Sequence, residues 1–166
     1  MIIRKEINAD IKAISEVTEA AFENHPVSHH TEQFIVNALR TANALTLSLV
    51  AEAHGKIVGH IAFSPVTISD GSQHWYGIGP LSVLPEHQKQ GVGKSLVREG
   101  LVLLKAMGAK GCVLVGDPEY YKRFGFRNFP DLIYEGIPQE YFLALPFDEK
   151  QARGVVVFHQ GFSATG

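Results

Sequence analysis

The sequence predicts an α/β fold of the α+β kind, in which a mixed, mainly antiparallel central sheet is flanked by helices. Two observations carry this prediction. Apolar residues recur at helical spacing in three segments. Between and after them lie strand-like segments, several of which are joined by short turns of the hairpin type. The predicted order of elements is β-α-α-β-β-β-α-β-α-β-β.

Length and composition bound the classes of protein to which the chain can belong. Its 166 residues contain no internal repeat and no linker, so residues 1–166 are expected to form a single domain. Its 15 Lys and Arg residues against 17 Asp and Glu give a net charge of −2, which argues against a dedicated binder of nucleic acid. Cys112 is the only cysteine, and this excludes a disulfide framework and a multi-cysteine zinc site.

No segment has the pattern of a targeting or membrane-spanning sequence. Charged residues follow two isoleucines after Met1, so no signal-peptide core fits there. The longest apolar run is only a few residues, far short of a membrane span. We therefore expect a cytoplasmic protein with no membrane partner.

The first part of the chain predicts one strand and two helices. The strand covers residues 2–7, and Asp10 can cap the helix that follows. Pro26 and short polar residues make residues 24–30 a loop, after which Thr31 can cap a second helix. The inward-facing residues of the two helices are Ile11, Ile14, Val17, Ala21 and Phe22, and then Phe34, Ile35, Ala38 and Leu39.

Three strands follow in succession, at residues 45–49, 57–68 and 75–84. Turn signals separate them at residues 54–56 and 70–71. Pro80 lies inside the third strand, and proline cannot donate a hydrogen bond to a neighbouring strand. We therefore expect an unpaired edge or a bulge at Pro80.

The second half begins with a long helix from Val92 that ends near Gly108. A buried strand is predicted at residues 111–115. Asp117 opens a short helix, which Gly125 ends. Two further strands are expected at residues 141–145 and 155–162.

The turn at residues 88–93 is the most informative segment. The backbone N–H groups at the start of a helix form a ready site for an anion, and Gly91 and Gly93 let a bulky phosphate approach closely. Lys89 and Lys94 add positive charge. The alternative is an ordinary turn between a strand and a helix.

Two known phosphate-binding motifs do not fit this turn. A P-loop requires glycine where Gln88 stands, and the dinucleotide fingerprint requires a third glycine where Leu96 stands. Instead, Gln88, Gly91 and Gly93 match the pattern Gln/Arg-x-x-Gly-x-Gly/Ala of the GNAT superfamily of N-acetyltransferases. Residues 121–126, Tyr-Lys-Arg-Phe-Gly-Phe, resemble a second segment of that superfamily, Tyr-x-x-x-Gly-Phe. The order of elements resembles the GNAT fold over nearly the whole chain.

The resemblance implies acetyl-CoA as co-substrate and no metal. It implies that the central strands ending near Val83 and Val115 splay apart, with the pantetheine arm pairing along Leu81, Ser82 and Val83. The backbone there could also stabilise the oxyanion that forms during transfer. The pyrophosphate would lie on the amides of Gln88, Lys89, Gln90, Gly91, Val92, Gly93, Lys94 and Ser95, and Tyr121 and Phe124 complete the implied cofactor-binding residues.

By the same resemblance, Tyr121 is the catalytic residue, with its hydroxyl beside the CoA sulfur as acid for the leaving thiolate. The alternatives are a packing role for Tyr121, and Tyr120 as the acid, although the spacing to Gly125 favours Tyr121. The sequence departs from many GNAT enzymes in having no glutamate at residues 75–82 and Leu114 where an asparagine is common. Candidate bases, which the sequence does not rank, are Glu32, His60 and His29.

The function implied is transfer of an acetyl group from acetyl-CoA to a primary amine, by direct attack in a ternary complex. The absent glutamate mildly favours an amine of low pKa, because only about one lysine side chain in 2,500 is neutral at pH 7. A non-catalytic acyl-CoA-binding or sensor module is the alternative. The acceptor is a small-molecule or peptide amine whose identity the sequence leaves open, and a homodimer through the late strands is compatible with it.

Overall fold

The computed structural model describes all residues from 1 to 166. Its central sheet follows the order β1-β2-β3-β4-β5-β7, in which only the β4–β5 pair is parallel. The strands are β1 (Ile2–Lys5), β2 (Leu47–Ala53), β3 (Lys56–Ile68), β4 (Trp75–Val83), β5 (Gly111–Val115) and β7 (Phe142–Pro146). The mixed, mainly antiparallel sheet is thereby confirmed.

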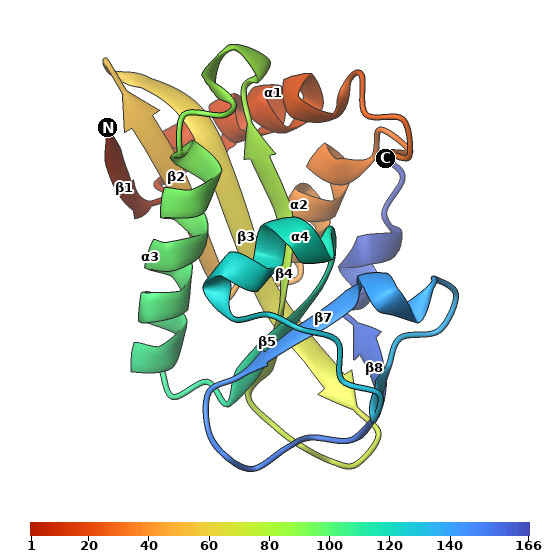
Figure 1. Cartoon of the computed structure of the whole chain (residues 1–166). Helices are drawn as coiled ribbons and strands as arrows, with labels where there is room; N and C mark the ends of the chain where they lie inside the picture. Colours follow the sequence, from red (N-terminus) through yellow and green to blue (C-terminus); the bar gives the residue numbers. More distant parts are fainter.

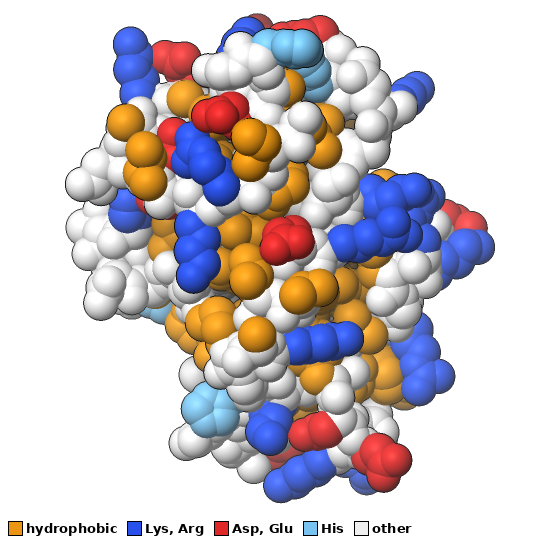
Figure 2. All heavy atoms as spheres, turned by 90° about the vertical axis from the view of Figure 1, so that its left-hand side faces the viewer, with side chains coloured by type: hydrophobic (Ala, Val, Ile, Leu, Met, Phe, Trp, Pro, Cys, Tyr) orange, Lys and Arg blue, Asp and Glu red, His pale blue; other side chains and the backbone are white.

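Helices flank the sheet, as Figure 1 shows. The first two, α1 (Ile11–Phe22) and α2 (Glu32–Thr41), lie together at one side, and α1 packs on β3 and β4. The long helix α3 (Val92–Ala106) packs on β2 and β3 at the other side. Apolar side chains run across the middle of the face that carries α3, with lysines and arginines around them (Figure 2). The short α4 (Pro118–Tyr121) lies in front of the sheet.

The close approach of α3 to β3 depends on two glycines. A Cβ atom at Gly100 would lie 2.3 Å from the ring of Phe63, and one at Gly59 would lie 2.9 Å from Val92. Phe63 is fully buried at this contact, and Trp75 and Cys112 are buried elsewhere in the core. This contact fixes the start of α3 relative to the edge of the sheet.

The C-terminal part differs from the sequence prediction. The last strand, β8 (Gly154–Phe158), is shorter than expected, because the chain turns into a 3₁₀ helix at Gln160–Ser163. The His159 Nδ1 atom accepts a hydrogen bond from the Gly161 N–H, which stabilises this turn. β8 pairs with the end of β3 and with β6 (Leu132–Ile133), a two-residue strand too short for the sequence pattern to show.

Asp10 and Thr31 occupy the predicted N-cap positions of α1 and α2, but neither side chain forms a cap bond. The Asp10 carboxylate forms no cap bond to α1, because it accepts hydrogen bonds from the Arg4 guanidinium and from the Ile7 N–H. Thr31 precedes α2 but its side chain forms no cap bond either. The second strand also runs over Leu47–Ala53 rather than residues 45–49, since it pairs with β3 along that whole length.

The bulge expected at Pro80 is confirmed. Ile61 on β3 pairs with Leu81, whereas Phe63 pairs with Ile78, so β4 carries one more residue than β3 over this interval. The extra residue lies at Gly79 and Pro80, and it bends β4 where the strand leaves β5. No helix in the fold is both long and apolar enough to cross a membrane.

Candidate active site

The two central strands separate part-way along their length. β4 and β5 pair only from Trp75 opposite Gly111 to Gly77 opposite Val113. Beyond that point β5 stays paired with β7, while the edge of β4 from Ile78 onward has no partner strand on this side. A cavity of about 860 Å³ opens between them, so the splayed central strands are confirmed.

One end of the cavity is the glycine turn. Lys89 and Gly91 have left-handed backbone angles, with φ of 62° and 86°, and α3 starts directly afterwards. The first helical hydrogen bond runs from the Ser95 N–H to the Gly91 carbonyl. The backbone N–H groups of residues 89–94 therefore make no hydrogen bond within the protein. A run of unpartnered donors at the positive end of a helix is suited to an anion of several oxygens.

Side chains add charge to this end. Lys89, Lys94 and Arg123 line the cavity, and none of them forms an ion pair. The Arg123 Nε atom donates to the Tyr120 carbonyl at 2.8 Å, and its guanidinium lies 4.6 Å from the centre of the Tyr120 ring. This residue was not predicted from the sequence. Three cations without ion-pair partners, together with free N–H groups, make this end chemically suited to phosphate groups.

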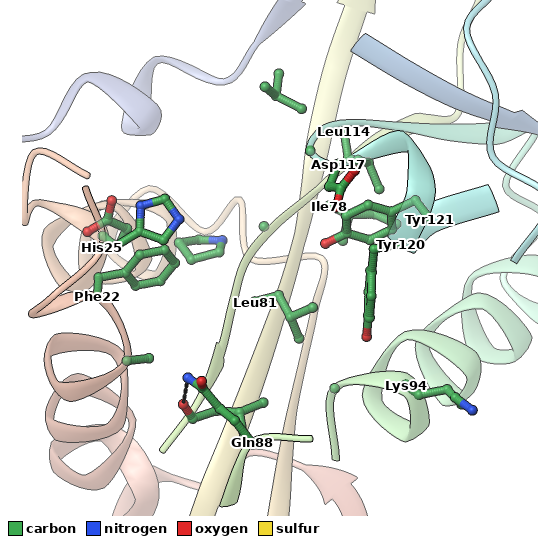
Figure 3. Close-up of a pocket in the computed structure, with 18 of the residues that line it drawn as sticks. Phe22, His25, Ile78, Leu81, Gln88, Lys94, Leu114, Asp117, Tyr120 and Tyr121 are labelled. Carbon is green, nitrogen blue, oxygen red and sulfur yellow. Dashed lines mark hydrogen bonds between the residues drawn. The ribbon is translucent and has the colours of Figure 1, made fainter. Parts of the chain in front are cut away.

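Two adjacent tyrosines from α4 enter the cavity in different directions (Figure 3). Tyr121 points across the cavity toward Phe22 and His25, whereas Tyr120 points toward the start of α3. A Cβ atom at Gly93 would lie 3.2 Å from the Tyr120 hydroxyl, and one at Gly116 would lie 2.6 Å from the Tyr121 ring. These two glycines leave room for the tyrosines.

Burial shifts the acidity of both phenols. It raises the pKa of Tyr121 to about 12, with smaller contributions from Tyr120 and Asp117. Burial also raises the pKa of Tyr120, and the positive charge of Arg123 opposes that shift. At neutral pH both hydroxyls therefore carry their proton and can donate it.

The segment that carries the tyrosines is short, as predicted. The Asp117 carboxylate caps α4 by accepting the Glu119 N–H at 3.0 Å, and α4 spans only Pro118–Tyr121. A 3₁₀ turn follows and ends at Gly125, where φ is 96°. The short path from β5 to Tyr121 holds the tyrosine at the point where β4 and β5 part.

The opposite wall is aromatic. Phe22 and His25 come from the end of α1 and the loop after it, with ring centres 5.6 Å apart. Tyr134, Phe158 and Phe162 join them from the C-terminal part, and the Phe158 ring lies 4.9 Å from Tyr134 and 5.1 Å from Phe162. No sequence pattern indicated these last three residues, because they lie more than a hundred residues from Phe22 in the chain.

The structure brings most of the predicted cofactor residues to one cavity. Those that line it are Leu81, Val83, Gln88, Lys89, Gly91, Val92, Gly93, Lys94 and Tyr121. The Gln88 side chain donates to the Val83 carbonyl and closes the end of β4 (Figure 3).

Four predicted residues lie outside the cavity lining. Ser82 alternates onto the other face of β4, where it is fully buried opposite His60. Phe124 packs against the Tyr120 ring instead, with ring centres 5.7 Å apart. Gln90 donates to the Glu86 carbonyl, and Ser95 lies one turn inside α3.

Of the three candidate bases, only Glu32 lines the cavity. His29 is exposed outside it. His60 is fully buried against Ser48, and burial lowers the pKa of its imidazole to about 4, with Arg40 adding to the shift and Glu6 opposing it. His, Cys, Asp and Glu side chains form no group of three that could hold a metal.

Comparison with known proteins identifies the family. Residues 12–126 match the model of the acetyltransferase (GNAT) family. The chain is 49% identical to a GNAT family acetyltransferase from Brucella melitensis, solved in complex with acetyl-CoA, with a TM-score of 0.87 over 97% of both chains. It is 32% identical to the GNAT family N-acetyltransferase YhbS from Escherichia coli, solved in complex with CoA, with a TM-score of 0.90 over 99% of this chain and 93% of that one.

A sequence comparison agrees. Over 127 residues the chain is 39% identical to YhbS of Escherichia coli strain K12, described as an uncharacterized N-acetyltransferase, covering 76% of this chain and 73% of that protein. The parted strands β4 and β5, the glycine turn and the tyrosine segment all lie within residues 12–126, which match the family model. On this evidence the chain belongs to the GNAT family of acetyltransferases.

Proposed function

We propose that the protein transfers the acetyl group of acetyl-CoA directly to a primary amine in a ternary complex. The observation that carries this proposal is the continuity of one cavity from the free N–H groups of residues 89–94, along the unpaired edge of β4, to Tyr121. An extended, phosphate-bearing thioester has a partner for each of its parts along that path. The two similar structures, one in complex with acetyl-CoA and the other with CoA, support the same cofactor.

Each part of the cavity has a task in this proposal. The N–H groups of residues 89–94, with Lys89, Lys94 and Arg123, hold the phosphates. The free edge of β4 at Leu81 and Val83 pairs with the amide groups of the pantetheine arm, as an added strand would. The same edge offers N–H groups to the thioester oxygen as it gains negative charge. In this proposal the thioester lies where the strands part.

Tyr121 is the acid of the proposed reaction. When the amine nitrogen attacks the thioester carbon and the C–S bond breaks, the sulfur leaves as a thiolate that must gain a proton. The Tyr121 hydroxyl is protonated at neutral pH, since burial raises its pKa to about 12. A free thiol has a pKa of about 8.5, so it is already a fair leaving group, and we expect the acid to contribute about 10- to 100-fold in rate.

The experiment combines binding and turnover in the same protein preparation. Calorimetric titration with acetyl-CoA measures binding, and release of free thiol with a panel of amines measures transfer. We expect Tyr121→Phe to lower kcat about 10- to 100-fold and to leave the acetyl-CoA Kd within about twofold. Tyr120→Phe is the matched control, because its hydroxyl faces Gly93 rather than the far wall.

The outcomes separate the proposal from its rival. Binding with turnover that depends on Tyr121 supports the enzyme. Binding without turnover on any amine would favour a non-catalytic acyl-CoA sensor on the same fold. Absence of acetyl-CoA binding would overturn both.

A further inference from the structure

The cavity divides into two halves of different chemistry. The half at the glycine turn carries Lys89, Lys94 and Arg123. The half that Tyr121 faces, toward Phe22 and His25, is lined by neither lysine nor arginine (Figure 3). The cavity has two carboxylates, those of Glu32 at the start of α2 and of Asp117 beside Tyr121. The second half is therefore suited to a cation, whereas the first is suited to an anion.

Glu32 is held in place and its charge is uncompensated. It lies in the first turn of α2, and the Ser28 hydroxyl lies 2.8 Å from each of its carboxylate oxygens. No ion pair of the protein includes Glu32. A half-buried carboxylate without a cationic partner leaves room for an ammonium group from a ligand.

Aromatic side chains line the same cavity as Glu32. Phe22, Tyr134, Phe158 and Phe162 are all half-buried and belong to its lining, which we call the aromatic wall. The Phe158 ring contacts those of Tyr134 and Phe162, and the turn that carries Phe162 packs on α2, the helix that begins at Glu32. Such a wall binds flat apolar groups by stacking and attracts cations through the negative faces of its rings.

We propose that this wall selects, as acceptor, a primary ammonium on an apolar, ring-bearing body with no carboxylate or phosphate beside the amine; 2-phenylethylamine is the simplest example. The inference rests on the proposed acetyl transfer and names its acceptor class. Glu32 binds the ammonium and the aromatic wall binds the ring. Neither lysine nor arginine lies in this half to receive an acidic group of the acceptor, so the carboxylate of an amino acid would find neither of these partners there.

The reaction balances for this acceptor. A new N–C bond to the acetyl group replaces the S–C bond of the thioester. The ammonium loses two protons overall, of which one is released to solvent and the other ends on the CoA thiol. No further reactant is needed.

The first test compares acceptors that differ in one feature each, by thiol release at saturating acetyl-CoA. 2-Phenylethylamine has both the ring and the free ammonium, phenylalanine adds a carboxylate, ethanolamine lacks the ring, and spermidine replaces the ring with further charges. We expect kcat/KM to be at least about tenfold higher for 2-phenylethylamine than for each of the others. Equal or faster turnover of phenylalanine, ethanolamine or spermidine would overturn the inference.

The second test assigns the wall. We expect Glu32→Gln to raise KM for 2-phenylethylamine about tenfold and to leave the acetyl-CoA Kd unchanged. Glu19→Gln is the matched control, because Glu19 is exposed on α1 and does not line this cavity. An unchanged KM in Glu32→Gln would contradict the assignment.

A binding measurement keeps the inference separate from the proposed function. If acetyl-CoA does not bind, the proposed function fails. If acetyl-CoA binds, calorimetric titration of 2-phenylethylamine into the protein saturated with CoA tests the acceptor wall without any turnover. Binding that Glu32→Gln weakens and Glu19→Gln does not supports the inference, and absence of binding at millimolar amine overturns it alone.

Discussion

The buried imidazole of His60 predicts that the protein loses stability in mild acid. The Ser48 hydroxyl donates its one proton to Glu6, so its hydrogen bond of 2.8 Å with His60 requires a proton on the His60 Nε2 atom. The Nδ1 atom is buried and has no partner. Protonating it would place a charge, and a donor without an acceptor, in the core.

The size of the effect follows from the pKa values. Burial lowers the pKa of His60 to about 4, against an ordinary value of 6.5. Since the pKa of His60 is lower in the folded state, the contribution of the neutral imidazole to stability is complete above pH 6.5 and is lost as the pH falls toward 4. Between pH 7.5 and 5 the free energy of unfolding should fall by about 2 kcal/mol, a large part of a typical total of about 5–15 kcal/mol.

Urea denaturation at the two pH values measures this loss. His60→Gln keeps a donor for Ser48 and does not titrate, so its own loss should be under about 0.5 kcal/mol, whatever its stability at pH 7.5. His29→Gln, at an exposed position, should behave as the unsubstituted protein. An equal loss in His60→Gln and the unsubstituted protein would refute the reasoning. NMR titration of the His60 ring gives a second measure, because it should not titrate above pH 5.

Three further predictions concern Gly100, Gly91 and Tyr121. Gly100→Ala should destabilise the protein by about 1–2 kcal/mol in urea, because its Cβ would lie 2.3 Å from the Phe63 ring, and adding Phe63→Leu should restore part of that loss. Gly91→Ala and its control Gly55→Ala should each lower the free energy of unfolding by about 1–2 kcal/mol, because both glycines have positive φ and open space around them. Only Gly91→Ala should also weaken acetyl-CoA binding in calorimetry. Burial raises the pKa of Tyr121 to about 12, so its protonated form contributes to stability below pH 10, and that contribution is lost as the pH rises toward 12. Tyr121→Phe should therefore remove the last step of the tyrosinate absorbance titration in alkali.

Local features of the sequence determined most of the elements. The period of the apolar residues located three helices, and turn residues separated the strands. The predicted end of α3 near Gly108 is confirmed, and φ at Gly108 is 88°. The predicted bulge at Pro80 is also confirmed. These predictions succeeded because each depends on the backbone of a few consecutive residues. The missing cap bond at Asp10 has the opposite cause, because Arg4, a partner outside the segment, binds the Asp10 carboxylate. Thr31 lacks the extended backbone of a typical N-cap, since its ψ is 1°.

The same division holds for the site. The glycine turn and Tyr121 lie in two short motifs, so a sequence alone can show them. The parting of β4 and β5 after Gly77 depends on which strands pair and for how long, which no local pattern contains. Arg123 joins the phosphate end only because it packs on the Tyr120 ring.

The sequence by itself determined the family, most of the element order and the end of the cavity that carries the glycine turn. Only the tertiary structure decided the other end, where Phe22, Glu32, Tyr134, Phe158 and Phe162 meet. The physical reason is that the anion site consists of the backbone of one continuous turn, whereas the aromatic wall requires α1, α2 and β8 to be packed around the same sheet. The acceptor recognition that we propose therefore depends on the folded chain and on no single segment in it.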